Sequence, residues 1–229
     1  MLIEARDLTL SFGTTPALRG ATLAAASGEI LAIIGRSGSG KSTLLHCLAG
    51  ILTPDSGEVW FDGRRLDQLP DRQRTRLRRT EFGFVFQFGQ LVPELTAADN
   101  IALPLLLAGT RRRDAYREAL SWLDRLGLGG LGTRRTGELS GGQAQRVAIG
   151  RALAIGPSVV FADEPTGALD STTGQDVMAL LVGAARQEQV TLLLVTHDPQ
   201  VAVYADRTVE VIDGITTELP QPSLTGGAS

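Results

Sequence analysis

The sequence predicts an α/β fold built around a phosphate-binding loop. Residues Gly35 to Ser42 match the pattern G-x-x-x-x-G-K-[ST] in full, between an apolar run of strand length (29–34) and a segment that reads as a helix (43–49). A chance match by a glycine- and serine-rich turn is the alternative, and the flanking strand and helix argue against it. Further apolar runs end in polar or acidic residues, as parallel strands do where an α/β sheet holds its ligand. These runs are 82–87, 158–164 and 191–196.

Each part of this loop has a chemical reason to be there. Glycines let successive backbone N–H groups turn toward phosphate oxygens, and the following helix adds free N–H donors and its positive dipole end. Lys41 brings a full charge to the β- and γ-phosphates of a nucleotide, and the Ser42 hydroxyl is placed to ligate Mg²⁺. The phosphate-binding candidates are Gly35, Arg36, Ser37, Gly38, Ser39, Gly40, Lys41, Ser42 and Thr43.

Composition limits the alternatives. The 229 residues, 43% of them hydrophobic, suit one large or two small domains with a proper core. A formal charge of −3 gives no bulk attraction to nucleic acid, so such binding would need a local patch. Cys47 is the only cysteine, which fits a reducing, cytosolic setting. The N-terminus has no apolar core of signal-peptide type, and the apolar stretch 101–109 is about half a membrane span, so we expect neither export nor a membrane crossing.

The segment before the phosphate loop reads as two antiparallel strands, 2–12 and 18–25, joined by a turn at 13–16. Phe12 closes the first strand, and its ring could stack on a flat base or belong to the core. After the first helix we expect a turn at 53–57, a short strand at 58–61 and a tight turn at Asp62-Gly63.

A basic run follows, in a helix expected to start near Asp71. The run could face anionic lipid head groups or nucleic acid, but a solvated helix face is the commoner explanation. Its members are Arg72, Arg74, Arg76, Arg78 and Arg79.

The middle of the chain is predicted to be helical. The pattern runs from 96 to 127, with Pro104 marking a bend or break and Arg111-Arg112-Arg113 opening a second helix. A glycine-rich loop leads to Leu-Ser-Gly-Gly-Gln at 139–143 and a further amphipathic helix. Gly150 inside that helix is unfavourable relative to Ala, which suggests a close packing contact.

Polar residues at strand ends are the remaining site candidates. Gln87 ends one predicted strand, and Asp163 and Glu164 end another, where a phosphate-loop protein keeps its Mg²⁺ ligand. Asp170 could be functional or simply a helix N-cap, and His197 at a strand end could be structural or functional. A closing hairpin is expected over 208–218, and a Pro-, Gly- and Ser-rich tail, 219–229, is expected to be disordered.

Taken together, these motifs resemble the ATP-binding-cassette family, from about Leu2 to Glu218, in order and approximate spacing. The Leu139 to Gln143 signature is close to diagnostic beside a phosphate loop. The resemblance implies one ATPase domain, 1–218, with a RecA-like α/β core, an antiparallel β subdomain and a helical subdomain inserted at approximately 90–155. The small departures are Ala144, where Gln is frequent, and Gly150, where Ala is usual.

The resemblance also implies roles for the site residues. Phe12 would stack on adenine in place of the frequent Tyr, and the loop would hold the phosphates of ATP. Gln87 and Asp163 would complete the Mg²⁺ and water shell with Ser42, Glu164 would be the general base, and His197 would contact the γ-phosphate. Two copies would join head to tail around two ATP, with the signature of one chain on the ATP of the other. The residues at that interface would be Ser140, Gly141, Gly142, Gln143 and Asp170.

A finer resemblance points to ATPases that work with lipoprotein-release, macrolide-efflux and cell-division permeases. It rests on the segments 86–88, 91–96, 100–105 and 164–171. It implies an integral-membrane permease partner whose coupling helix meets the segment after Gln87, and a peripheral place at the cytoplasmic face of the cell membrane.

Three functions remain open at this point. The chain could drive an exporter or mechanotransmission complex, signal through a permease as a cell-division regulator, or act as a soluble cassette on DNA or ribosomes. The last is disfavoured, because the chain has one phosphate loop, one signature, one cysteine and a short insertion. No nucleic-acid partner is therefore expected.

Overall fold

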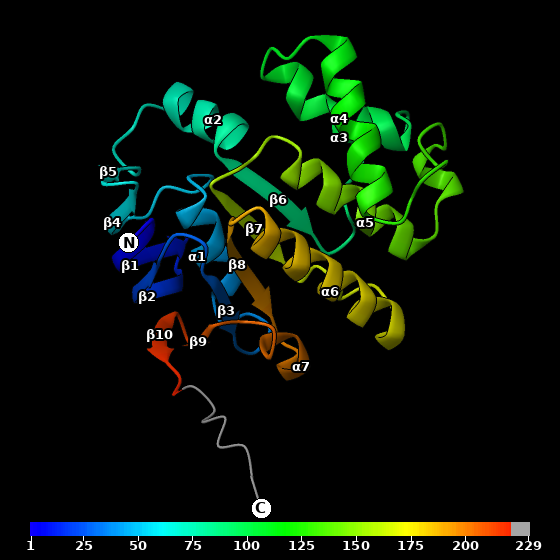
Figure 1. Ribbon diagram of the computed structural model, residues 1–229. Coiled ribbons are helices and arrows are strands. Elements are labelled where there is room, and N and C mark those ends of the chain that lie inside the picture. Colours follow the sequence, from blue (N-terminus) through cyan, green and yellow to red (C-terminus); the bar gives the residue numbers. More distant parts are fainter. Residues whose placement is uncertain (221–229) are drawn as a thin grey trace, which may run out of the picture.

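A computed structural model describes residues 1–220 of the chain, and the expected disordered tail lies for the most part outside the described residues. Two sheets and a set of helices make up the molecule (Figure 1). The strands are β1 (Ile3–Phe12), β2 (Thr15–Ala25), β3 (Ile30–Ile34), β4 (Ser56–Phe61), β5 (Arg64–Arg65), β6 (Phe82–Phe86), β7 (Val159–Asp163), β8 (Thr191–Thr196), β9 (Arg207–Ile212) and β10 (Ile215–Glu218). The helices are α1 (Lys41–Leu48), α2 (Asp71–Thr80), α3 (Ala97–Leu107), α4 (Arg112–Arg125), the 3-10 helix η1 (Thr136–Glu138), α5 (Gly141–Leu153), α6 (Ser171–Gln187) and α7 (Pro199–Ala202).

The central sheet has the order β10-β9-β3-β8-β7-β6. Strands β9, β3, β8, β7 and β6 run parallel, and β10 adds to the β9 edge as the second strand of a hairpin. A smaller antiparallel sheet has the order β2-β1-β4-β5. The predicted closing hairpin is therefore confirmed, and its first strand also joins the parallel sheet beside β3.

Side-chain alternation in the parallel strands divides the core into two clusters. One face of the sheet, including Leu31 and Phe161, packs with α1 and the antiparallel sheet. The other face, including Ile30 and Val160, packs with α3 to α6. The expected fold class, an α/β core with an antiparallel β part and an inserted helical part, is confirmed.

Helices α3, α4 and α5 stand together at one end of the molecule, beside α2 (Figure 1). Thr96 and Asp99 form a capping box at the start of α3, and Tyr116 of α4 donates a hydrogen bond to the same Asp99. The helix continues through Pro104 and ends at Leu107, so of the predicted bend or break at the proline, the break does not occur.

Gly150 has the close contact predicted for it. A Cβ at this position would lie 2.9 Å from Ile101 Cδ1 and 3.0 Å from Leu126 Cδ1. Because glycine has no side chain, α5 can pack this closely against the helices that precede it. Within residues 1–220, no helix is both long and apolar enough to span a membrane.

Candidate functional site

The phosphate loop follows β3 and is shaped by close backbone approach. Gly35 has φ +150°, and a Cβ there would lie 2.3 Å from the carbonyl oxygen of Val211 in β9. Gly40 has φ +105°, and its Cβ would lie 2.4 Å from the carbonyl oxygen of Ala17 in β2. Only glycine fits these two positions. Because Gly40 is also the N-cap of α1, no capping side chain accepts a hydrogen bond from the first turn. The end of α1 keeps its donors for an anion.

Two polar side chains are buried in the loop. Lys41 is 5% exposed, and its Nζ donates to the carbonyl oxygens of Gly35, at 2.9 Å, and Arg36, at 2.8 Å. The Ser39 hydroxyl is buried and has no hydrogen-bond partner among the described residues. A buried ammonium held only by carbonyls and an unpaired hydroxyl both fit phosphate oxygens as partners.

A hydroxyl–carboxylate pair lies next to the loop. Ser42 Oγ donates to Asp163 Oδ1 at 3.1 Å, where β7 ends. Burial raises the pKa of Asp163 above its ordinary value, although the Ser42 hydrogen bond opposes the shift. No group of three or more His, Cys, Asp or Glu that could hold a metal occurs in residues 1–220. Mg²⁺ commonly takes one or two carboxylates plus substrate phosphates, so this pair fits Mg²⁺ brought by a nucleotide.

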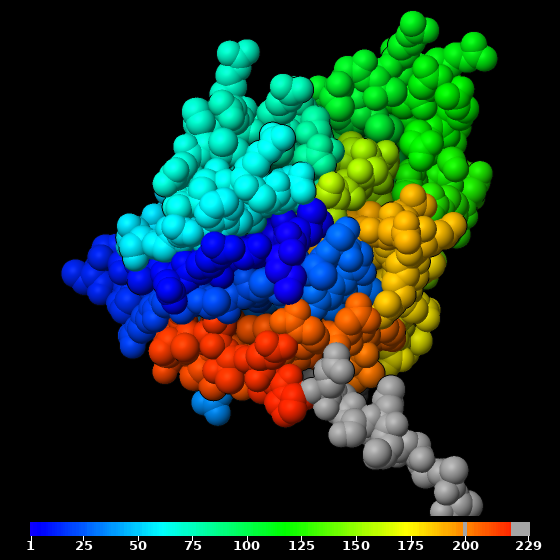
Figure 2. Space-filling view, turned by 60° about the vertical axis from the view of Figure 1, so that its left-hand side comes forward, coloured from blue at the N-terminus to red at the C-terminus, as the bar shows by residue number. Residues whose placement is uncertain are grey.

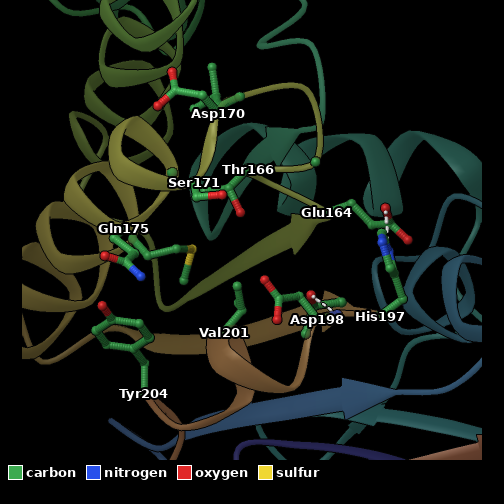
Figure 3. A pocket seen from close by; sticks show the side chains of 14 residues that line it. Glu164, Thr166, Asp170, Ser171, Gln175, His197, Asp198, Val201 and Tyr204 are labelled. Carbon is green, nitrogen blue, oxygen red and sulfur yellow. Dashed lines mark hydrogen bonds and ion pairs between the residues drawn. The ribbon is translucent and has the colours of Figure 1, made fainter.

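Glu164 and His197 come together because β7 and β8 are neighbours in the parallel sheet. The Glu164 Oε2 atom is 3.0 Å from His197 Nδ1, a contact drawn in Figure 3. Glu164 has φ +46°, a left-handed conformation that non-glycine residues seldom adopt, and its N–H donates to Val195 O at 2.9 Å. Such backbone conformations concentrate at functional sites.

The Glu164–His197 pair and the start of the phosphate loop border one open cleft. It is lined by Gly35, Arg36, Ser37, Glu164 and His197, together with parts of β3 and β9. Gln87 lies close to the chain after Glu164, because a Cβ on Gly167 would be 2.8 Å from Gln87 Nε2. The structure thus brings the loop, the Glu–His pair and Gln87 to one edge of the sheet, as the strand-end pattern predicted.

A cavity of about 240 Å³ continues behind Glu164 and His197, between α6 and α7. Figure 3 shows Asp170 and Ser171 on one side of it and Val201 and Tyr204 on the other. The cavity has room for several water molecules. Because Glu164 lines it, the cavity can hold water beside this residue.

The signature segment lies apart from that cleft. Ser140 caps α5, accepting from Gln143 N at 3.3 Å, while Gln143 Oε1 accepts from Ser140 N at 2.9 Å. Ser140 and Gly141 are exposed. No residue of 139–143 lines the cleft of the phosphate loop in the part of the chain described.

The start of α6 packs against the signature. A Cβ on Gly142 would lie 2.5 Å from Thr173 Cγ2, and Asp170 caps α6 by accepting from Thr173 N at 3.0 Å. That backbone hydrogen bond lowers the pKa of Asp170. The N-cap interpretation of Asp170 is therefore confirmed, and it leaves the exposed end of α6 beside the signature.

Phe12 is 56% exposed, so of its two interpretations the core one is excluded, and stacking on a base stays a prediction. It ends β1 opposite Thr15, with its ring at the surface of the antiparallel sheet. The ring is free to stack on a planar ligand.

Two residues that we had not singled out hold the segment after Gln87. Arg151 donates to the carbonyl oxygens of Gly89, at 2.8 Å, and Gln90, at 2.7 Å, and burial lowers its pKa. Gln145 Nε2 donates to Phe86 O at 2.8 Å. A sequence signal was available, because both are polar residues on the inward side of an amphipathic helix.

A glycine-built loop with a buried lysine, a Ser–Asp pair and a glutamate beside a parallel sheet are typical of a phosphate-loop nucleotide-binding site. The sequence profile of the ABC transporter family matches residues 18–167. The chain belongs to this family.

Proteins with similar sequences are named as parts of transport systems. The chain is 45% identical over 217 residues to "Lipoprotein-releasing system ATP-binding protein LolD" of Geobacter metallireducens, covering 93% of this chain and 96% of that protein. It is 45% identical over 221 residues to "Macrolide export ATP-binding/permease protein MacB" of Marinobacter nauticus, covering 95% of this chain but 34% of that protein. The expected subfamily is confirmed.

Solved structures agree with the fold. A dimeric post-hydrolysis state of the ATP-binding cassette MJ0796, bound to ADP and Pi, superimposes with a TM-score of 0.85 at 36% identity, covering 96% of this chain and all (100%) of that one. A second dimeric structure of the same cassette gives 0.86 at 37% identity, with the same coverage. The chain is an ABC transporter ATPase similar to LolD and MacB.

Proposed function

We propose that this chain hydrolyses ATP as a head-to-tail homodimer and drives a separate membrane permease. The observation that carries the proposal is the incomplete site: the exposed signature at Ser140 and Gly141 contributes nothing to the cleft of its own phosphate loop. A second copy can supply it, with the N-terminus of α5 directed at the phosphates. The dimeric state of the related cassette supports this arrangement.

In this proposal the residues of one chain bind and orient the phosphates. Lys41 and the backbone of 35–43 hold the phosphate oxygens, and Ser42, Asp163 and Gln87 would hold Mg²⁺. When bound, Mg²⁺ neutralises phosphate charge as the transferred group separates. The Phe12 ring covers the base. The signature residues Ser140 to Gln143 and Asp170 of the second chain close the site.

Glu164 takes the proton of the attacking water, which adds to the γ-phosphorus as the bond to the bridging oxygen breaks. His197, whose Nδ1 is 3.0 Å from the Glu164 carboxylate, would orient Glu164 and contact the γ-phosphate. The products are ADP and inorganic phosphate. The cavity lined by both residues would hold the water.

An apolar groove supports docking of a permease helix. It lies between α2, the end of α3 and α5, next to the segment after Gln87. Ile51 is 44% and Leu107 62% exposed at its rim, and Phe88 nearby is 75% exposed. Exposed apolar side chains gathered around one groove are typical of a protein interface. The chain would then sit peripherally at the cytoplasmic face of the membrane, held by its permease.

Co-purification tests the proposal. Tagged Glu164→Gln protein, which should trap the closed dimer, is recovered from detergent-solubilised membranes with ATP and Mg²⁺. We expect an ABC permease to accompany it. Leu107→Asp should abolish recovery of the permease, whereas Leu120→Asp, at a leucine 50% exposed on α4, should not. Recovery of soluble partners or nucleic acid instead of a permease would refute the membrane assignment.

A further inference from the structure

Positive charge is concentrated at one end of this molecule. Residues 71–79 and 111–117 contain nine arginines and two aspartates, a charge of +7, in a chain whose net charge is −3, so the remainder carries −10. The segments belong to α2 and to the start of α4, which lie at the same end in both views (Figures 1 and 2). Such segregation creates a local positive field on an acidic protein.

The arginines of α2 divide into two sides. Arg74 and Arg78 turn toward the body of the protein, where Arg74 Nη1 donates to Thr53 Oγ1 at 2.5 Å and Arg78 Nη1 to Gly50 O at 2.6 Å. These two arginines anchor the helix. Part of the basic run therefore has a structural role.

The other side of α2 has no such structural role. Arg72, Arg76 and Arg79 follow one another at a spacing of four and three residues, which places them on one stripe of the helix. All three are exposed, and none has a salt bridge or side-chain hydrogen bond within residues 1–220. Their charges face solvent.

The start of α4 has the same character. Arg111 is the N-cap residue, without a side-chain capping bond, and Arg112 and Arg113 open the helix. Cations at a helix N-terminus oppose its dipole, so the local helix does not gain from them. Arg112 lies over the Tyr116 ring at 5.4 Å, whereas Arg111 and Arg113 have no ion pair in the described chain.

The apolar groove lies beside one set and next in the sequence to the other. Arg79 of α2 and Leu107 of α3 line the same groove, and Arg111 follows Leu107 by four residues. Arg79 therefore borders the apolar groove directly, and Arg111 follows the groove residue Leu107 after one short turn. The guanidinium group of arginine can bind two oxygens of a phosphodiester through paired hydrogen bonds. Lys41 is the only lysine of this chain, so every other basic side chain of the Lys/Arg type is an arginine.

We propose that this arginine face, Arg72, Arg76, Arg79, Arg111 and Arg113, binds the anionic phospholipid head groups around the docked permease. The inference rests on the proposed function, because the groove sets which end meets the membrane. A lipid surface fits better than nucleic acid, since the groove that Arg79 borders is apolar and would face a permease rather than a phosphate backbone. The chain would then have its own affinity for the membrane, in addition to that of its permease.

Vesicle co-sedimentation without a permease tests this. The probes are vesicles of phosphatidylcholine alone and of equal parts phosphatidylcholine and phosphatidylglycerol. We expect binding to the second only, weakened by high salt. At about fivefold per arginine, Arg111→Gln with Arg113→Gln should lower the partition coefficient roughly 25-fold, and Arg72→Gln with Arg76→Gln similarly. The matched control, Arg19→Gln with Arg64→Gln, removes two exposed charges elsewhere and should change it less than about twofold.

Equal binding to both vesicles, or an equal loss in the control, would overturn the proposal. So would tighter binding to duplex DNA than to anionic vesicles, if the same variants abolish it. The permease co-purification described above tests the proposed function independently. If the permease is recovered but the protein does not bind anionic vesicles, only the lipid contact is refuted. If the protein binds anionic vesicles in a charge-dependent way but no permease is recovered with it, only the proposal that it is a transporter subunit is refuted.

Discussion

Two alanine substitutions in the phosphate loop separate backbone strain from steric overlap. Gly38 has φ +80° and nothing within 4 Å of where an alanine methyl would lie, whereas Gly40 has φ +105° and would place its methyl 2.4 Å from Ala17 O. Left-handed backbone costs a non-glycine residue about 1–2 kcal/mol. Overlap with packed backbone adds about 1–3 kcal/mol. We therefore expect Gly38→Ala to lower the free energy of unfolding by about 1–2 kcal/mol and Gly40→Ala by about 2–5 kcal/mol.

Urea unfolding of the nucleotide-free protein measures both values. The slope of the free energy of unfolding against urea should stay unchanged, because neither variant alters the surface exposed on unfolding. ATP should also protect Gly40→Ala less against unfolding, since the shifted loop binds phosphate less well. Equal losses in the two variants would refute the claim that β2 constrains this loop by contact.

Other predictions concern the chemistry. Glu164→Gln should lower kcat by about 10²–10⁴-fold while fluorescent-nucleotide affinity is retained, and phosphate release at more than a tenth of the wild-type rate would exclude Glu164 as the base. Burial raises the pKa of Asp163, so folding favours the neutral carboxyl over the charged one. The neutral carboxyl therefore adds to the free energy of unfolding at acid pH, and this contribution is lost as pH rises through the raised pKa. Asp163→Asn should therefore raise the Tm of nucleotide-free protein at neutral pH, and the gain should vanish below the ordinary pKa of aspartate, about 3.9. A gain of the same size at both pH values would show that another cause is at work.

Much of this fold is predictable because its signals are local. The apolar runs of β3, β7 and β8 are strands buried along almost their whole length, and such runs can be recognised without tertiary information. The N-cap role of Asp170 and the close packing at Gly150 follow from single residue types in context. Strand ends in a parallel sheet converge on one edge, which is why Glu164 and His197 could be expected at one site.

Other features depend on contacts that local patterns do not encode. Pro104 leaves α3 unbroken because the helix packs against α4 and α5, whereas propensity alone favours a break. The division of the α2 arginines depends on Gly50 and Thr53, far back in the sequence. The exposure of Phe12 depends on which strand ends face solvent, which its residue type alone does not decide.

The most direct test of the account is the mass of the Glu164→Gln protein by size exclusion with light scattering. We predict a species of twice the 24.2 kDa chain with ATP and Mg²⁺, and monomer with ADP. Adding Ser140→Arg, on the exposed signature, should restore the monomer while ATP still binds to each chain. A monomer in ATP, or a dimer that survives the change at Ser140, would contradict a site completed by the signature of a second copy.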